Sequence, residues 1–177
     1  MKHIFENYQS VVPENFRQNA RVWIYQADRV FTPSEANEIT EALDSFNHEW
    51  NSHGDKVASF VHLFFNRFIV LMADEQVVHV GGCSTDASYR FLKGLERIHN
   101  VKLFGRHSLA FLVDGMIRTI PLTELQEVLD HGEITGDTLY FNNTILTGKD
   151  FVTRWIVPAG STWLATRFKE LTASSGN

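Results

Sequence analysis

The residues most able to do chemistry gather in one short turn, Gly81–Asp86, which reads Gly-Gly-Cys-Ser-Thr-Asp. A glycine pair lets the backbone approach a ligand closely, and the helix predicted to follow offers free amide donors in its first turn. A cysteine thiolate here would be stabilised by those amides and by the helix dipole. The turn therefore predicts either an anion-binding site or a thiol-dependent enzyme. The candidate residues are Gly82, Cys83, Ser84, Thr85 and Asp86, with Cys83 as the candidate catalytic residue.

The same turn also has a purely structural interpretation. Asp86 would lie in the first turn of the helix, where it competes for the amides and adds a negative charge that disfavours a thiolate or a phosphate. Ser84, Thr85 or Asp86 would then cap the helix, and Cys83 would be a small buried apolar residue. Burial or exposure of the Cys83 side chain separates the two interpretations.

Two further kinds of residue could complete a site. Arg67 interrupts an apolar stretch, so it marks either a turn or bulge, or an interior cation that needs a carboxylate such as Asp74 or Asp86. We include Arg67 as a candidate anion contact. The chain has 8 histidines, and one of them, for example His62 or His79, could serve the thiol as a base. Their spacing matches no metal-binding motif, so we predict no metal and no cofactor.

Basic residues recur at helical spacing after this turn and continue beyond the predicted helix. They are Arg90, Lys93, Arg97, Lys102 and Arg106. Such a stripe could dock an acidic partner or RNA, or it could be a solvated helix face, interrupted by Glu96. The formal net charge of −5 gives no global field that would collect nucleic acid. We therefore expect a small molecule or a protein as the partner, including a second copy of the chain.

The elements that would position these residues follow from capping and periodicity. The sequence Thr32-Pro33-Ser34-Glu35 predicts a helix start, because it combines an N-cap hydroxyl, a proline in the first turn and a capping-box glutamate. A second helix is predicted after Gly81–Asp86 and a third over Pro121–His131. The inner face of the second would carry Phe91, Leu92, Leu95 and Ile98. The predicted strands are Arg21–Gln26, part of Lys56–Phe65, Phe68–Met72, Val77–Val80, Ser108–Val113, Met116–Ile120 and Thr138–Phe141.

Taken in order, these elements predict an α+β fold with an antiparallel sheet. The order strand, helix, strand, strand, helix, strand is that of the ferredoxin-like (split βαβ) core, here with one extra strand and a C-terminal helical or extended segment. Residues 1–20 are interpreted as an N-terminal arm, 21–171 as a single domain and 172–177 as a flexible tail. A hydrophobic content of 44% in 177 residues supports a folded core rather than disorder.

The sequence predicts neither export nor membrane insertion. Glu6 interrupts the apolar stretch that a secretory signal would need. The longest apolar run, Phe68–Ala73, is far shorter than the roughly 20 residues that cross a bilayer. The single cysteine fits a reducing compartment, so we expect the protein in the cytoplasm.

Three segments make the sequence similar to a known family: Val22–Gln26, Asn66–Met72 and Gly82–Ser88. With them the chain resembles, from Arg21 through the Trp163 region, a family of uncharacterised bacterial proteins often labelled as ABC transporter ATPases. That resemblance implies an ATPase-related protein as a third hypothesis, and it implies no role for particular residues.

The residues that form a phosphate-binding P-loop are missing from the chain. That loop needs the pattern G-x-x-x-x-G-K-[ST], and the only Gly-Lys pair is Gly148-Lys149. Asp150 stands where the hydroxyl is required, and Asn143 where the first glycine belongs. The leading hypothesis is therefore a binding or interaction domain, and the alternative is a thiol-dependent enzyme using Cys83.

Overall fold

The structure, a computed structural model, describes residues 5, 7–76, 78–105 and 107–168. The chain divides into two compact units. The first unit consists of residues 1–6, 106–142 and 154–177, and the second of residues 7–105 and 143–153. The candidate site residues 67 and 82–86 all belong to the second unit.

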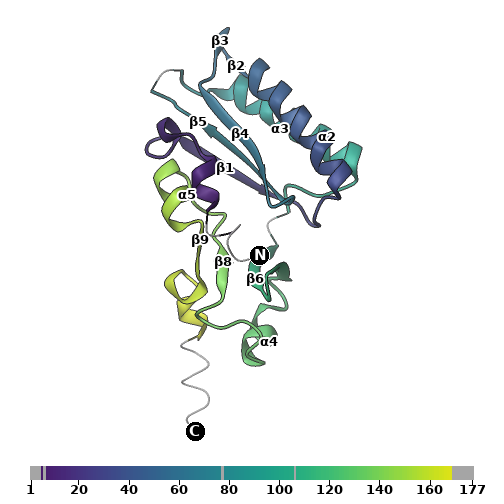
Figure 1. Cartoon of the computed structure of the whole chain (residues 1–177), viewed down its shortest axis with the longest axis vertical. Helices are drawn as coiled ribbons and strands as arrows, with labels where there is room; N and C mark the ends of the chain where they lie inside the picture. The colour runs from purple at the N-terminus through teal and green to yellow at the C-terminus, as the bar shows by residue number, and fades with distance from the viewer. Residues whose placement is uncertain (1–4, 6, 77, 106, 169–177) are drawn as a thin grey trace. The chain divides into compact units, whose positions relative to one another are not determined.

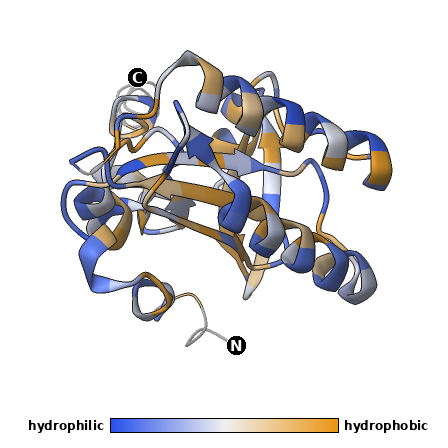
Figure 2. Cartoon of the chain, turned by 90° about the horizontal axis from the view of Figure 1, so that it is seen from above, coloured by the Kyte–Doolittle hydropathy of each residue, from blue (hydrophilic) through white to orange (hydrophobic). Residues whose placement is uncertain are grey.

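A three-stranded antiparallel sheet with the order β1-β5-β4 is the centre of the second unit. Its strands are β1 (Arg21–Gln26), β4 (Ser59–Phe64) and β5 (Phe68–Ala73). Every residue of β5 is buried, because the strand is central and both faces of the sheet are covered. Figure 2 shows hydrophobic colour along the strands and hydrophilic colour on the outward faces of the long helices. The continuous apolar run in the sequence is thus confirmed as a central strand.

Two long helices cover one face of this sheet (Figure 1). They are α2 (Pro33–Glu49) and α3 (Gly82–His99). Ile39 and Leu43 of α2 and Leu92 and Leu95 of α3 are buried in one core cluster with Leu71 of β5. Each side chain buried in this way stabilises the fold by roughly 1.5–3 kcal/mol, so the apolar stripes hold both helices against the sheet.

The opposite face of the sheet is covered by segments far apart in the chain. They are the short 3₁₀ helices η1 (Tyr8–Val11) and η2 (Glu14–Phe16), and the helix α5 (Gly148–Arg154). The Tyr8 hydroxyl donates to the Phe151 carbonyl over 2.8 Å. The Phe151 ring also lies 5.4 Å from that of Phe64, and the Phe16 ring 6.1 Å from that of Phe60. The N-terminal arm therefore packs as part of this core.

Helix α2 begins where the sequence predicts. The Thr32 hydroxyl accepts from the Glu35 amide over 3.3 Å, and the Glu35 carboxylate accepts from the Thr32 amide over 2.8 Å, which completes a capping box. The guanidinium of Arg29 donates to both carboxylate oxygens of Glu35, at 2.8 and 2.7 Å, and to the His99 carbonyl at 2.7 Å. Arg29 thereby links the start of α2 to the end of α3.

Replacing Glu35 with glutamine is expected to reduce the acid sensitivity of the fold. The hydrogen bond from Arg29, followed by that from the Thr32 amide, lowers the pKa of Glu35 from 4.5 to about 2. A carboxyl group with a lowered folded pKa stabilises the protein above its unfolded pKa, and this stabilisation is lost as the pH falls toward about 2. Urea unfolding across this range should give a shallower pH dependence for Glu35→Gln than for the wild type. Glu41→Gln, on the exposed side of α2, should behave as the wild type does.

Between α2 and β4 the chain forms a small hairpin of β2 (Asn51–Ser52) and β3 (Asp55–Lys56). Its turn uses positive φ angles at His53 (53°) and Gly54 (94°). The Ser52 hydroxyl donates to the His79 carbonyl over 2.7 Å, so the hairpin also supports the segment that leads into α3.

The first unit contains a four-stranded antiparallel sheet with the order β7-β6-β8-β9. Its strands and helices are β6 (Ser108–Val113), β7 (Met116–Pro121), α4 (Leu125–Asp130), β8 (Leu139–Phe141), β9 (Ile156–Pro158) and the 3₁₀ helix η3 (Ala159–Ser161). Asp114 (φ 51°) and Gly115 (φ 76°) form the turn between β6 and β7, so the two predicted strands Ser108–Val113 and Met116–Ile120 pair as a hairpin. Phe111, Leu129 and Tyr140 are buried in its core.

Several expectations from the sequence need correction. Residues 78–80 of the predicted strand Val77–Val80 form no strand, and residue 77 lies outside the described residues. Strand β5 pairs with β1 and β4. Ile98 is 74% exposed rather than on the inner face of α3. The predicted helix Pro121–His131 is shortened to α4.

The α+β class with antiparallel sheets is confirmed, whereas a ferredoxin-like core is not. The strand expected to complete that core, β6, pairs with β7 and β8 in the sheet of the first unit. The predicted tail 172–177 lies outside the described residues. Within the described part of the chain, no helix is both long and apolar enough to cross a membrane.

Candidate functional site

The Gly81–Asp86 turn forms the N-terminus of α3, and its N-cap is Gly81, which has no side chain that could accept a capping hydrogen bond. The structural interpretation of this turn is therefore wrong about which residue caps the helix. It is also wrong about Cys83, which is exposed rather than buried. The hydroxyls of Ser84 and Thr85 both donate back to the Gly81 carbonyl, each over 3.0 Å. Asp86 lies exposed on the helix surface.

Neighbouring side chains hold this turn in place. The indole N–H of Trp50 donates to the Ser84 carbonyl over 2.9 Å, and the Ser84 hydroxyl lies 3.4 Å from that of Ser52. Both Trp50 and Ser84 are buried. A Cβ atom added at Gly81 would lie 3.2 Å from Nε2 of His53, so the histidine ring packs closely on this glycine. The hydroxyls of Ser84 and Thr85 and the Ser84 carbonyl are thus occupied with structural contacts.

Arg67 lies in the turn between β4 and β5 and is only 4% exposed. Its Nε donates to the Ala27 carbonyl over 3.1 Å and its Nη2 to the Asp28 carbonyl over 2.9 Å. Burial lowers the pKa of its guanidinium, and the charge of Asp28 opposes that change. The burial of Arg67 agrees with the hypothesis of an interior cation. Its hydrogen bonds to Ala27 and Asp28, however, are with backbone carbonyls and not with the carboxylates of Asp74 or Asp86.

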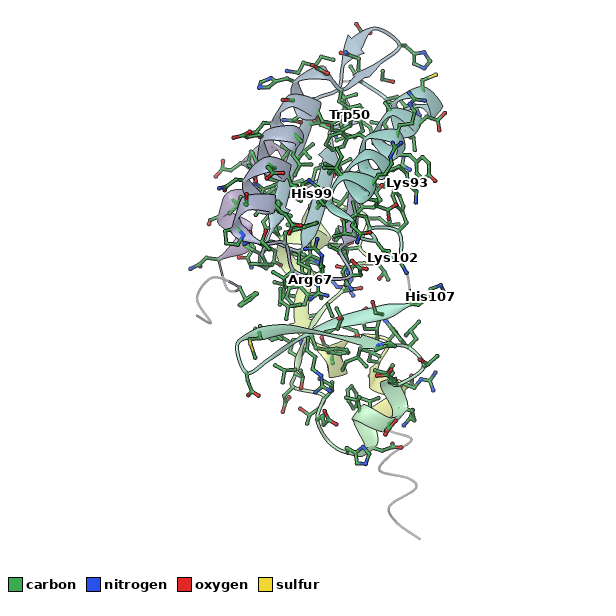
Figure 3. All side chains as sticks on the ribbon, turned by 90° about the vertical axis from the view of Figure 1, so that its right-hand side faces the viewer. Trp50, Arg67, Lys93, His99, Lys102 and His107 are labelled. Atoms are coloured by element: carbon green, nitrogen blue, oxygen red, sulfur yellow. The ribbon has the colours of Figure 1, made fainter. Side chains whose placement is uncertain are left out.

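The structure does not bring Arg67 to Cys83. Arg67 precedes β5, whereas α3 follows the opposite end of that strand, and a six-residue strand spans about 20 Å. Figure 3 shows Arg67 at the other end of the unit from Trp50, whose indole contacts the start of α3. Among the described residues no group of His, Cys, Asp and Glu could hold a metal ion.

The outer face of α3 gives a better developed site. Lys93 Nζ lies 2.6 Å from Oε2 of Glu96, 4.6 Å from the ring centroid of Phe104 and 5.8 Å from that of Tyr89. The Tyr89 and Phe104 rings lie 5.1 Å apart, and Phe104 lies 5.3 Å from Tyr25 of β1. An ammonium group is thus held between a carboxylate and two aromatic rings.

Glu96 organises this face. Its Oε1 accepts from the Leu103 amide over 2.6 Å and from the Phe104 amide over 3.4 Å, which fixes the segment after α3 beside the helix. Burial works to raise the pKa of Glu96, but the hydrogen bonds from Lys93 and Leu103 outweigh it and lower that pKa. The bond with Glu96 raises the pKa of Lys93. Both groups therefore stay charged at neutral pH.

Exposed cations border this arrangement. Arg97 and Lys93 line an open pocket together with Glu96, and Figure 3 labels Lys93 and Lys102 on this part of the unit. The side chains of Arg90, Arg97 and Lys102 are exposed, and within the described part of the chain none of them forms an ion pair. Arg106, the last residue of the predicted stripe, lies outside the described residues. We call Tyr89, Arg90, Lys93, Arg97, Lys102 and Phe104 the basic aromatic face.

Sequence reasoning found the cations of this face but missed its aromatic residues. Tyr89 precedes Lys93 by one helical turn, so its spacing could have placed it on the stripe. Phe104 gives no such signal, because the hydrogen bonds that its amide and the Leu103 amide donate to Glu96 form in the folded chain.

No protein-family model, no curated protein and no solved structure matches this chain. The fold alone defines the structural class of this chain, which is an α+β protein with antiparallel sheets.

Proposed function

We propose that this protein is a binding domain that docks an acidic segment of a partner protein on the basic aromatic face. One observation carries the proposal: in a chain of net charge −5, Arg90, Arg97 and Lys102 are exposed and form no ion pair with any described residue, and Arg97 lines an open pocket with Lys93 and Glu96. Local clustering of one charge against the overall balance favours a partner of the opposite charge.

The aromatic side chains favour a peptide over a simple anion. Tyr89 is 50% exposed and Phe104 is half-buried, so apolar side chains of a bound segment would find contact area beside the cations. The guanidinium groups of Arg90 and Arg97 can each donate two parallel hydrogen bonds to one carboxylate. An acidic segment with an apolar residue between its carboxylates fits this combination.

RNA is the other ligand that cations and aromatics together could bind. The net charge of −5 opposes RNA more than a short acidic segment, because RNA carries a charge on every nucleotide and extends beyond the local patch. The thiol-dependent enzyme stays the alternative prediction from the sequence. Cys83 is exposed, as that hypothesis requires, but Arg67 does not accompany it.

The proposal is tested by fluorescence anisotropy with a labelled peptide of Glu, Asp and Phe residues. We expect binding that weakens with added salt, and a dissociation constant at least about tenfold higher for Arg90→Glu/Arg97→Glu, equivalent to about 1.4 kcal/mol. The matched control is Lys56→Glu/Lys149→Glu, which makes the same charge change at exposed lysines of β3 and α5.

Three results would contradict the proposal. The first is that the wild type does not bind the acidic peptide. The second is that the control variant loses as much affinity as the double arginine variant, since the effect would then come from total charge. The third is tighter binding of a single-stranded oligonucleotide of the same net charge, which would assign the face to nucleic acid.

A further inference from the structure

The two edges of the β1-β5-β4 sheet differ in how their backbone groups are used. On β1, the outward Val22 amide donates to the Leu146 carbonyl over 2.9 Å, and the Gln26 side chain accepts from Asn143 over 2.9 Å. The segment after β8 therefore covers that edge. On β4 the corresponding groups are not covered in this way.

The direction in which the backbone N–H and C=O groups of β4 point follows from the hydrogen bonds of the residues just before the strand. The Ala58 carbonyl accepts from Asp74, on the β5 side, over 2.8 Å, whereas the Val57 amide donates to Trp50, on the other side, over 2.9 Å. Because hydrogen-bonding direction alternates along an antiparallel strand, the backbone groups of Ser59, Val61 and Leu63 point away from β5. Within the described part of the chain these outward groups have no backbone partner.

The sequence of β4 carries none of the features that usually protect an open edge. Ser59–Phe64 contains no lysine, no proline and no carboxylate, and its ladder with β5 runs without a bulge. Edge strands of this kind pair with further strands unless something prevents it. An uncharged strand with regular free donors and acceptors is therefore a docking edge.

We propose that β4 pairs antiparallel with β4 of a second copy of this chain. A two-fold axis at Val61 would place Val61 opposite its own copy and Ser59 opposite Leu63, so that the outward groups of these three residues exchange hydrogen bonds reciprocally. The two sheets would then join into one continuous sheet.

The side chains favour a copy over an unrelated strand. Within β4 the Phe60 and His62 rings stack, with centroids 5.9 Å apart. Both side chains are only half-buried. In the proposed register Phe60 of each chain lies across from His62 of the other, so the same ring pair recurs on both sides of the axis. No charge on β4 opposes this pairing.

Amide hydrogen exchange tests the pairing residue by residue. The amides of Phe60 and His62, which face β5, should be protected at every protein concentration. Those of Val61 and Leu63 should gain at least about tenfold protection as concentration rises, in step with dimer formation measured by sedimentation. A chain that remains monomeric, or a dimer that leaves Val61 and Leu63 unprotected, would overturn the proposal. Protection of these amides in the monomer would also overturn it, because the chain itself would then cover the edge.

A charge on the edge gives an independent test. His62→Lys introduces the residue that commonly guards edge strands, and we expect the dimer dissociation constant to rise at least about tenfold. The matched control is His131→Lys, at the exposed end of α4, which should dimerise as the wild type does. Equal dimerisation of His62→Lys and the control, with circular dichroism showing both folded, would argue against the β4 interface.

Discussion

Replacing Gly148 with alanine should destabilise the second unit by about 3 kcal/mol, because the added methyl group would overlap backbone atoms that cannot easily move. A Cβ atom on Gly148 would lie 1.8 Å from the carbonyl oxygen of Phe16 and 2.9 Å from its carbonyl carbon. Gly148 begins α5, and its amide donates to the Ala20 carbonyl over 2.8 Å. The arm and α5 would therefore have to separate, which exposes the sheet face that they cover.

The chain contains a well-matched control for this substitution. Gly94 lies inside α3, and a Cβ atom there would meet nothing within 4 Å. Gly94→Ala should stabilise the protein by about 0.5–1 kcal/mol, since alanine loses less backbone entropy in a helix. Urea unfolding followed by circular dichroism would measure both variants. If Gly148→Ala were as stable as Gly94→Ala, the close approach of α5 to the arm would be wrong.

Replacing Arg67 with methionine should cost about 3 kcal/mol of stability. The substitution keeps an unbranched apolar stem. It removes the charged group that donates hydrogen bonds to the Ala27 and Asp28 carbonyls. Hydrogen bonds from a charged group contribute roughly 1.5–3 kcal/mol each, and a buried carbonyl left unpaired adds a desolvation penalty. The connection from β1 toward α2 should therefore loosen together with the β4–β5 turn.

Arg90→Met provides the comparison for Arg67→Met. Arg90 is exposed on α3, so the same chemical change there should alter the free energy of unfolding by no more than about 0.5 kcal/mol. Both variants would be measured by urea unfolding at neutral pH. A decrease in the free energy of unfolding of less than about 1 kcal/mol for Arg67→Met would contradict a stabilising role of these carbonyl contacts.

Alone, the sequence determined the elements whose signals are local. The start of α2 follows from hydroxyl, proline and glutamate within four residues, and these groups meet whatever the rest of the chain does. The turn at Asp114-Gly115 is similar, because two adjacent residues that tolerate positive φ decide it. The burial of β5 followed from its uninterrupted apolar sequence.

Strand pairing was decided only by the tertiary structure. Any β-forming segment presents the same backbone groups, so the sequence did not show that β5 pairs with β1 and β4 rather than with residues 77–80. For the same reason, local sequence patterns did not predict that β6 belongs to the sheet of the first unit.

The candidate site shows the same division. The spacing of Arg90, Lys93 and Arg97 on one helix face is a property of the sequence. The position of Phe104 depends on two amides that reach the Glu96 carboxylate, and that of Arg67 depends on carbonyls 40 and 39 residues away. The Arg67 contacts join distant parts of the chain, so only the folded structure, in which the entropy of ordering them has been overcome, decides that these groups meet.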